Sequence, residues 1–146
     1  MTGMRFVRPM TPADVPAVAE LAGQLGYPST AEAVEHRFRE LSERPAAAVL
    51  VATEDGAVVG WIHVSRVASL VASDVALIGG LVVDEGHRSG GIGARLVEAA
   101  EAWAREHGAR TMTVSSRVAR EGAHRFYLRE GYELLKTSHV FVKPLV

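Results

Sequence analysis

The chain has 146 residues, enough for one domain with a hydrophobic core; 48% of them are hydrophobic and 23% are charged. A formal net charge of −1 argues against a general nucleic-acid binder, and the absence of cysteine excludes disulfides, thiolate nucleophiles and cysteine-based zinc sites. The N-terminus lacks the apolar core of a secretion signal, and no apolar run approaches the ~20 residues that span a bilayer. We therefore expect one cytoplasmic domain over residues 1–146, with no membrane or nucleic-acid partner and no metal.

The first third of the chain predicts one strand followed by two helices. Residues 4–10 read as a short strand, and Thr11 is a typical N-cap for the apolar-periodic segment that follows. Gly26 suits the end of that helix. Ser29 with Glu32 three residues later predicts a capping box at the start of a second helix.

The middle of the chain changes to strands. Residues 46–53 and 57–65 flank the compact turn "EDG", which predicts a hairpin. Residues 75–83 form an unbroken apolar run with β-branched residues, typical of a buried strand. Gly79 and Gly80 interrupt this run and indicate a bulge that bends the strand.

The last third alternates helix and strand. Residues 92–108 carry apolar side chains on one helical face, residues 110–116 read as a strand, and residues 121–131 read as a short helix. Residues 132–146 are expected to form a terminal pair of strands. This order of elements predicts an α/β (α+β) fold, a mixed sheet with helices on its faces.

The glycine-rich segment "GHRSGGIGARL", residues 86–96, lies between a strand and a helix. Such a loop presents free backbone N–H groups at the positive end of the helix dipole, which is an anion site. A P-loop is excluded because Gly93 is followed by Ala94 and not by lysine, and a dinucleotide fingerprint fails because Leu96 replaces its third glycine.

A third pattern, R-x-x-G-x-G, is satisfied by Arg88, Gly91 and Gly93, and the strand and helix around it are in register. This segment resembles the acetyl-CoA loop of the GNAT acetyltransferases. A later stretch, "AHRFYLREGYE", resembles the second conserved helix of that family, and in particular that of the aminoalkylphosphonate N-acetyltransferases. The resemblance implies a GNAT-like, mostly antiparallel central sheet with splayed central strands flanked by helices.

The resemblance also implies an N-acetyltransferase that moves an acetyl group directly from acetyl-CoA to a primary amine of a small molecule or peptide. The loop backbone would hold the pyrophosphate, because a Cβ at its glycines would keep the phosphates away. Arg120 stands where the family usually has asparagine, so contact with the cofactor and exposure to solvent both remain open for it. The implied cofactor-binding residues are Leu81, Val82, Val83, Arg88, Ser89, Gly90, Gly91, Ile92, Gly93, Ala94 and Arg120.

Candidate catalytic residues are fewer. Tyr127 occupies the family's general-acid position, where a phenol can protonate the departing thiolate; packing of its helix is the alternative role. Gly80 stands where the family commonly has a glutamate as general base. The remaining candidates for the base are His63, which could instead be a structural histidine, and a water molecule held by backbone groups. Tyr27 and His63 are the candidate substrate-side residues, and we expect His87 to face solvent.

Two questions stay open at this level. The absent glutamate at position 80 also fits a non-catalytic acyl-CoA-binding or sensor module, and the oligomeric state is open between a monomer and a homodimer. The expected substrate-side segments carry no acidic cluster that would hold a polycationic aminoglycoside, which favours a smaller amine or a peptide N-terminus.

Overall fold

The computed structural model describes residues 5–88 and 90–146, so the prediction for Ser89 lies outside the described residues. The chain divides into two compact units, one up to Val114 and one from Ser115 onward, and each is described by itself. No helix among the described residues has the length and apolar character needed to cross a bilayer.

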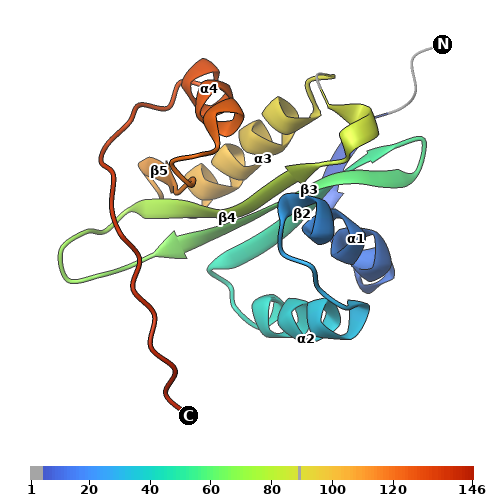
Figure 1. Cartoon of the computed structure of the whole chain (residues 1–146), viewed down its shortest axis with the longest axis horizontal. Helices are drawn as coiled ribbons and strands as arrows, with labels where there is room; N and C mark the ends of the chain where they lie inside the picture. Colours follow the sequence, from blue (N-terminus) through green and yellow to red (C-terminus); the bar gives the residue numbers. More distant parts are fainter. Residues whose placement is uncertain (1–4, 89) are drawn as a thin grey trace. The chain divides into compact units, whose positions relative to one another are not determined.

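The first unit is built on a five-stranded sheet (Figure 1). Its strands lie in chain order; neighbouring strands run antiparallel from β1 to β4, and β5 runs parallel to β4. The predicted mixed, mostly antiparallel sheet is confirmed. The strands are β1 (Arg5–Pro9), β2 (Ala47–Glu54), β3 (Ala57–Val67), β4 (Val75–Val83) and β5 (Thr111–Val114).

The hairpin between β2 and β3 turns on two residues. Asp55 and Gly56 both have positive φ, 51° and 84°, which is the backbone of a type I′ turn. Such a turn matches the twist of the two strands, so the predicted hairpin forms where the sequence placed it.

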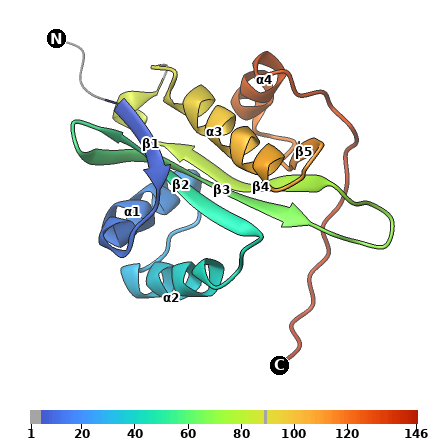
Figure 2. The ribbon, with the colours of Figure 1, turned by 180° about the vertical axis from the view of Figure 1, so that it is seen from behind.

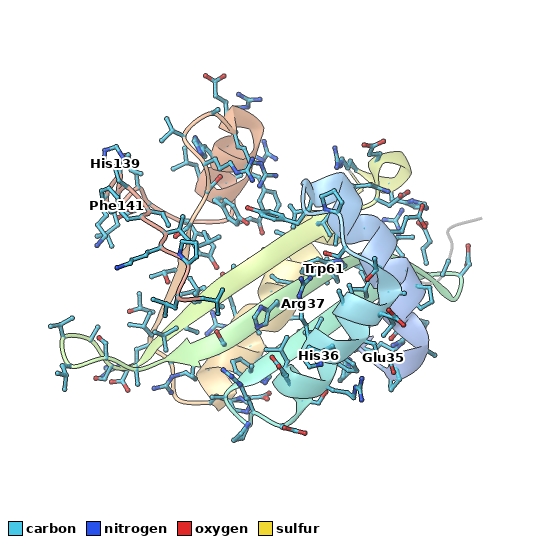
Figure 3. All side chains as sticks on the ribbon, turned by 60° about the horizontal axis from the view of Figure 1, so that its bottom comes forward. Glu35, His36, Arg37, Trp61, His139 and Phe141 are labelled. Carbon is cyan, nitrogen blue, oxygen red and sulfur yellow. The ribbon has the colours of Figure 1, made fainter. Side chains whose placement is uncertain are left out.

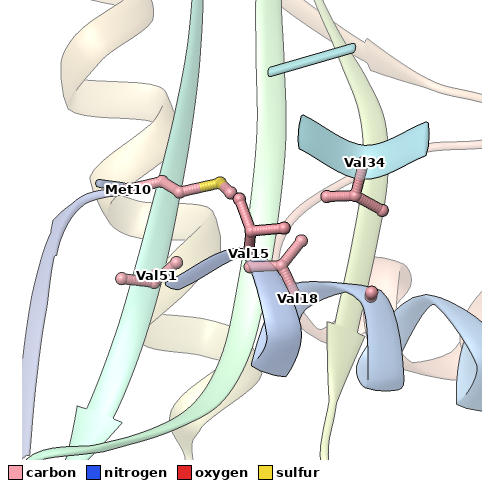
Figure 4. Close-up of a cluster of buried hydrophobic side chains, with 6 residues drawn as sticks. Met10, Val15, Val18, Val34 and Val51 are labelled. Carbon is pink, nitrogen blue, oxygen red and sulfur yellow. The ribbon is translucent and has the colours of Figure 1, made fainter. Parts of the chain in front are cut away.

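Helices cover both faces of the sheet. Helices α1 (Val15–Leu25) and α2 (Ala31–Ser42) lie on one face and α3 (Ile92–Glu106) on the other (Figures 1 and 2). On the first face, Met10 and residues of β2, α1 and α2 form a buried cluster (Figure 4). Ile62 and Leu96, both fully buried, are the largest side chains of the core between the sheet and α3. These two apolar layers fix the sheet relative to the helices that carry the candidate site.

The entry to α1 is held by a buried carboxylate. Asp14 is 6% exposed and accepts hydrogen bonds from the backbone N–H of Thr11 (2.7 Å) and from both terminal nitrogens of Arg8 (2.8 and 2.9 Å). The Arg8 guanidinium, more than any other group, holds the pKa of Asp14 below its usual value. Thr11 caps the short 3₁₀ turn Pro12–Asp14 that leads into α1, as predicted.

The start of α2 differs from the prediction by one residue. Thr30 is the N-cap, and its hydroxyl accepts a hydrogen bond from the Ala33 N–H (3.1 Å). The expected box between Ser29 and Glu32 is therefore wrong, because the Ser29 hydroxyl donates to the Tyr27 carbonyl (3.0 Å). The capping-box spacing indicated Ser29, and the local backbone places the cap one residue later, at Thr30.

The second unit contains α4 (Glu121–Arg129), which is followed by Gly131 with a φ of 93°. The predicted terminal pair of strands is wrong: residues 133–146 are neither helix nor strand, and their apolar side chains are exposed. A strand needs a neighbour for its backbone hydrogen bonds, and α4 is the one regular element described within this unit. Alternating apolar residues alone did not supply that neighbour.

Candidate active site

The strand β4 has one open edge. Its pairing with β5 runs from Val75 to Ile78 and stops where β5 ends at Val114. Residues 79–83 continue the strand with no further strand beside them on that edge among the described residues. The expected splay of the central strands is this end of the pairing between β4 and β5 beyond Ile78.

The backbone of β4 alternates between its two neighbours. Asp84 donates its N–H to the Val59 carbonyl of β3 (2.8 Å), and Val82 pairs directly with Trp61. Because neighbouring residues of a strand direct their backbone groups to opposite sides, Leu81 and Val83 present theirs to the open edge. Val82 lies with its backbone toward β3 and its side chain buried, away from that edge.

The loop after β4 ends in the N-terminus of α3. Gly91 is the N-cap and has a φ of 82°, a conformation that favours glycine. The first backbone hydrogen bond of the helix runs from the Arg95 N–H to the Gly91 carbonyl (3.1 Å). The N–H groups of Ile92, Gly93 and Ala94 therefore have no acceptor within the helix. Together with the helix dipole, worth about half a positive charge, they form an anion site.

Side chains from three elements anchor the front of this loop. Asp84 accepts hydrogen bonds from Gln24 Nε2 of α1 (2.9 Å) and pairs with His87 Nδ1 (2.8 Å), and the pKa of its carboxyl lies below the usual value, first because of Gln24. His87 Nε2 in turn lies 3.3 Å from Glu54 of β2. The expectation that His87 faces solvent is wrong: it is half-buried between two carboxylates. Gln24 also accepts the Glu85 N–H (2.9 Å), a contact across sixty-one positions that no local pattern signals.

The rear of the loop is tied to β1 and to β4. Arg5 donates to the Gly90 carbonyl (2.8 Å), and Arg88 Nε donates to the Val83 carbonyl (3.2 Å). Arg88 is exposed, and its contact closes the loop back onto the end of the open strand. These hydrogen bonds fix the loop between the open edge of β4 and the N-terminus of α3.

A cavity of about 350 Å³ lies between α1, α2 and the sheet. Tyr27 and His63, the two candidate substrate-side residues, both line it. Figure 3 shows Trp61 of β3 and Arg37 of α2 at this place, while Glu35 and His36 lie elsewhere on α2. Most of the other lining side chains are apolar, and none of the described lining residues is acidic.

Tyr127 and Arg120 belong to the second unit. Tyr127 lies on α4, with its ring 5.2 Å from that of Phe126 and 5.7 Å from that of Tyr132. Burial raises the pKa of the Tyr127 phenol, and the nearby Arg120 charge acts in the opposite direction. Arg120 is the N-cap residue of α4. The phenol therefore stays protonated well above neutral pH, as a general acid requires.

Comparison with known proteins places the chain among acetyltransferases. Residues 16–132 match the family described as "Acetyltransferase (GNAT) family". The chain is 31% identical over 144 residues to the aminoglycoside N(6')-acetyltransferase type 1 of Stenotrophomonas maltophilia, covering 95% of this chain and 93% of the relative. It is 41% identical over 97 residues to the aminoalkylphosphonate N-acetyltransferase of Salmonella typhimurium, covering 65% of this chain and 61% of the relative.

Solved structures give the same fold. The structure of AAC(6')-Iy in complex with the bisubstrate analogue CoA-S-monomethyl-acetylneamine superposes with a TM-score of 0.86 at 20% identity, covering 97% of this chain and 99% of that one. At this identity the likeness shows the fold alone.

Proposed function

The chain belongs to the acetyltransferase (GNAT) family and is an acetyl-CoA-dependent N-acetyltransferase, and we propose that it acetylates a small, largely apolar primary amine bound in the cavity beside Tyr27 and His63. The observation that carries this proposal is a pair of backbone sites in the first unit, the open edge of β4 and the N-terminus of α3. Both sites lie in the same unit as the cavity.

We assign the acetyl donor, acetyl-CoA, to the open edge of β4 and the N-terminus of α3. The N–H groups of residues 92–94 suit the pyrophosphate of acetyl-CoA, because uncharged backbone donors at a helix start bind phosphates without side chains. Further along, the backbone groups of Leu81 and the N–H of Val83 suit the amides of the pantetheine arm. In this arrangement the Val83 N–H is the donor nearest the thioester, where it stabilises the oxyanion that forms on the carbonyl oxygen.

The acceptor is assigned to the cavity by its chemistry. The wall is mostly apolar, and Arg37 is the one side chain of fixed charge among its described residues; such a wall favours an amine with an apolar body, or one that also carries an anionic group. A polycationic aminoglycoside would meet Arg37 and no carboxylate there. The two curated relatives act on an aminoglycoside and an aminoalkylphosphonate by name, so the acceptor differs between members even where the donor is shared.

The leaving thiolate needs a proton, and Tyr127 is the residue we assign to this task. Its phenol is protonated at working pH and is reasonably matched to a thiol with a pKa near 8.5. Arg120 is assigned to the cofactor arm in place of the asparagine that the family usually carries there. We also propose that the protein forms a homodimer, which a measurement of its mass in solution tests.

Two measurements test the function. A ligand that binds only the native state must raise the melting temperature, so millimolar acetyl-CoA is expected to stabilise the protein. Release of free CoA is then measured with 2-phenylethylamine, 2-aminoethylphosphonate, a short peptide and kanamycin as acceptors. The expected order of kcat/KM places one of the first three amines above kanamycin. The absence of a thermal shift contradicts the donor site, and a clear preference for kanamycin contradicts the acceptor assignment.

A further inference from the structure

The imidazole of His63 is set directly against a bulge in β4. His63 lies on β3 opposite Gly80, and the register then shifts, so that the next pair is Val64 with Ile78 and Gly79 is left without a partner. The bulge was expected from the two glycines, and the structure shows what it accommodates. The bulged residue lies beside the ring of His63.

Glycine at position 79 leaves room for the ring. A Cβ there would lie 2.6 Å from His63 Nδ1 and 3.1 Å from Cε1, distances that real Cβ atoms do not reach without a shift. At Gly80 the corresponding Cβ would lie 2.9 Å from the Trp61 ring instead. The absence of a side chain at 79 therefore lets the ring of His63 lie directly against the backbone of β4.

Two ring nitrogens of this wall are buried without a hydrogen bond among the described residues. His63 Nε2 and Trp61 Nε1 are buried without a hydrogen bond, and neither ring nitrogen of His63 has a hydrogen-bond partner among the residues that the structure describes. A histidine with a purely structural role normally has at least one ring nitrogen hydrogen-bonded. An unpaired imidazole in the wall of a cavity points to a ligand as its partner.

The surroundings of His63 favour its neutral form. Tyr27 from the loop after α1 and Arg37 from α2 line the same cavity, and Arg44 and Arg66 line a second cavity of about 200 Å³ that His63 also borders. None of the described residues lining either cavity is a carboxylate. Burial lowers the pKa of His63 below its usual value. The imidazole is therefore a neutral proton acceptor at pH 7.

The position of the ring suits the reacting atoms. The open edge of β4, to which the thioester is assigned above, is the edge away from β3. Neighbouring strands lie about 4.8 Å apart, so a ring that extends from β3 over Gly79 spans most of the distance to that edge. An amine held in the cavity then lies between Nδ1 and the thioester carbonyl.

We propose that His63 is the general base of this enzyme and takes the role for which Gly80 offers no side chain. This inference rests on the proposed function. The amine nitrogen bonds to the thioester carbonyl carbon and becomes positively charged, and Nδ1 of His63 accepts a proton from it. The tetrahedral intermediate then collapses, the carbon–sulfur bond breaks, and the departing sulfur takes a proton from the Tyr127 phenol. The products are the acetamide and free CoA; the imidazolium releases its proton to solvent, and the Tyr127 phenolate takes a proton back from solvent.

The test compares His63→Asn and His63→Ala with a matched control. Asparagine places an amide nitrogen near the position of Nδ1 but accepts no proton at neutral pH. His36→Asn makes the same substitution on the exposed outer side of α2, where His36 pairs with Glu40 (3.0 Å) outside the cavity. For each variant we would measure the Kd for CoA, and kcat between pH 5 and 9 with the best amine of the panel above.

Wild type is expected to lose kcat as the pH falls through the pKa of His63, below about 6.5, because the base becomes protonated. His63→Asn should lower kcat at pH 8 by about 10²- to 10⁴-fold, lose that acidic limb, and bind CoA within twofold of wild type. Added imidazole is expected to restore part of kcat to His63→Ala, and His36→Asn should behave as wild type.

Two outcomes overturn the inference and separate it from the function. If CoA binds and acetyl transfer proceeds in His63→Asn with wild-type kcat and an unchanged acidic limb, His63 is not the base while the proposed function stands. If wild type binds no CoA, or acetylates no amine of the panel, the proposed function fails and this inference fails with it.

Discussion

Replacing Gly91 with alanine tests the anion site at the start of α3 most directly. Gly91 has a φ of 82°, and a Cβ built on it meets no atom within 4 Å. The substitution therefore causes no clash with any residue that the structure describes. Its cost is the left-handed backbone conformation, about 1–2 kcal/mol for a residue other than glycine. For a chain of this size we expect a fall in melting temperature of about 2–8 °C.

The effect on CoA is expected to exceed this backbone cost. An added methyl group at the helix start occupies the space that the pyrophosphate needs, and it displaces the phosphates from the N–H groups of residues 92–94. A hydrogen bond to a charged group contributes about 1.5–3 kcal/mol, and each 1.4 kcal/mol is tenfold in affinity. Gly91→Ala should therefore weaken CoA binding by about ten- to hundred-fold, measured by titration calorimetry.

Gly26 provides a matched control for this variant. It has a φ of 103° at the end of α1, and a Cβ there also meets nothing within 4 Å. Gly26→Ala should thus show a similar loss of melting temperature with CoA affinity unchanged. If Gly91→Ala binds CoA as wild type does, or if both variants lose affinity equally, the assignment of the pyrophosphate to this helix start is refuted.

Three further predictions concern the acid, the entry to α1 and the core. Tyr127→Phe should lower kcat by about 10²-fold or more while the Kd for CoA stays within twofold. Steady-state assays of CoA release measure kcat, and an unchanged kcat removes Tyr127 from the reaction. Asp14→Asn should lower the free energy of unfolding by about 2 kcal/mol at pH 7, because it weakens the partly buried pair with Arg8. Because the pKa of Asp14 is lower in the folded state, its contribution to stability is present above about pH 4 and is lost as the pH falls through the folded pKa. The difference in unfolding free energy between wild type and Asp14→Asn, measured by urea unfolding, should therefore be smaller at pH 3 than at pH 7. An equal difference at the two pH values contradicts the stabilising role of the Asp14 carboxylate. Leu96→Ala, at a fully buried position against the sheet, should cost about 3–5 kcal/mol, while Glu98→Ala on the exposed side of the same helix should leave the melting temperature within about 1 °C.

Local signals in the sequence were sufficient wherever a short segment determines its own conformation. The Asp55–Gly56 turn needs only two residues that tolerate positive φ, and Gly26 and Gly131 end their helices for the same reason. The glycine loop was identified by spacing, because an anion site at a helix start is made of consecutive backbone groups. The same logic failed for residues 133–146, where a strand depends on a partner that the pattern cannot supply.

The contacts that give the loop its shape could not be predicted in this way. Gln24 reaches Asp84 and the Glu85 N–H from another element, and His87 lies between carboxylates of two different segments. Such hydrogen bonds form between residues that the fold brings together, and a single polar side chain in a sequence does not indicate its partner. His87 was therefore expected at the surface, although it helps to hold the front of the donor loop.

The sequence by itself determined the main order of strands and helices, the glycine loop to which we assign the donor, and the family to which the chain belongs. A donor that binds backbone groups of a contiguous segment leaves its pattern in consecutive residues. Only the tertiary structure revealed the cavity to which we assign the acceptor. It is assembled from α1, α2, β2, β3 and β4, and it brings Tyr27, Arg37 and His63 together from segments with no shared motif. The tertiary structure also showed the role of Gly79, which appeared in the sequence as a bulge and in the fold lets the imidazole of His63 lie directly against β4.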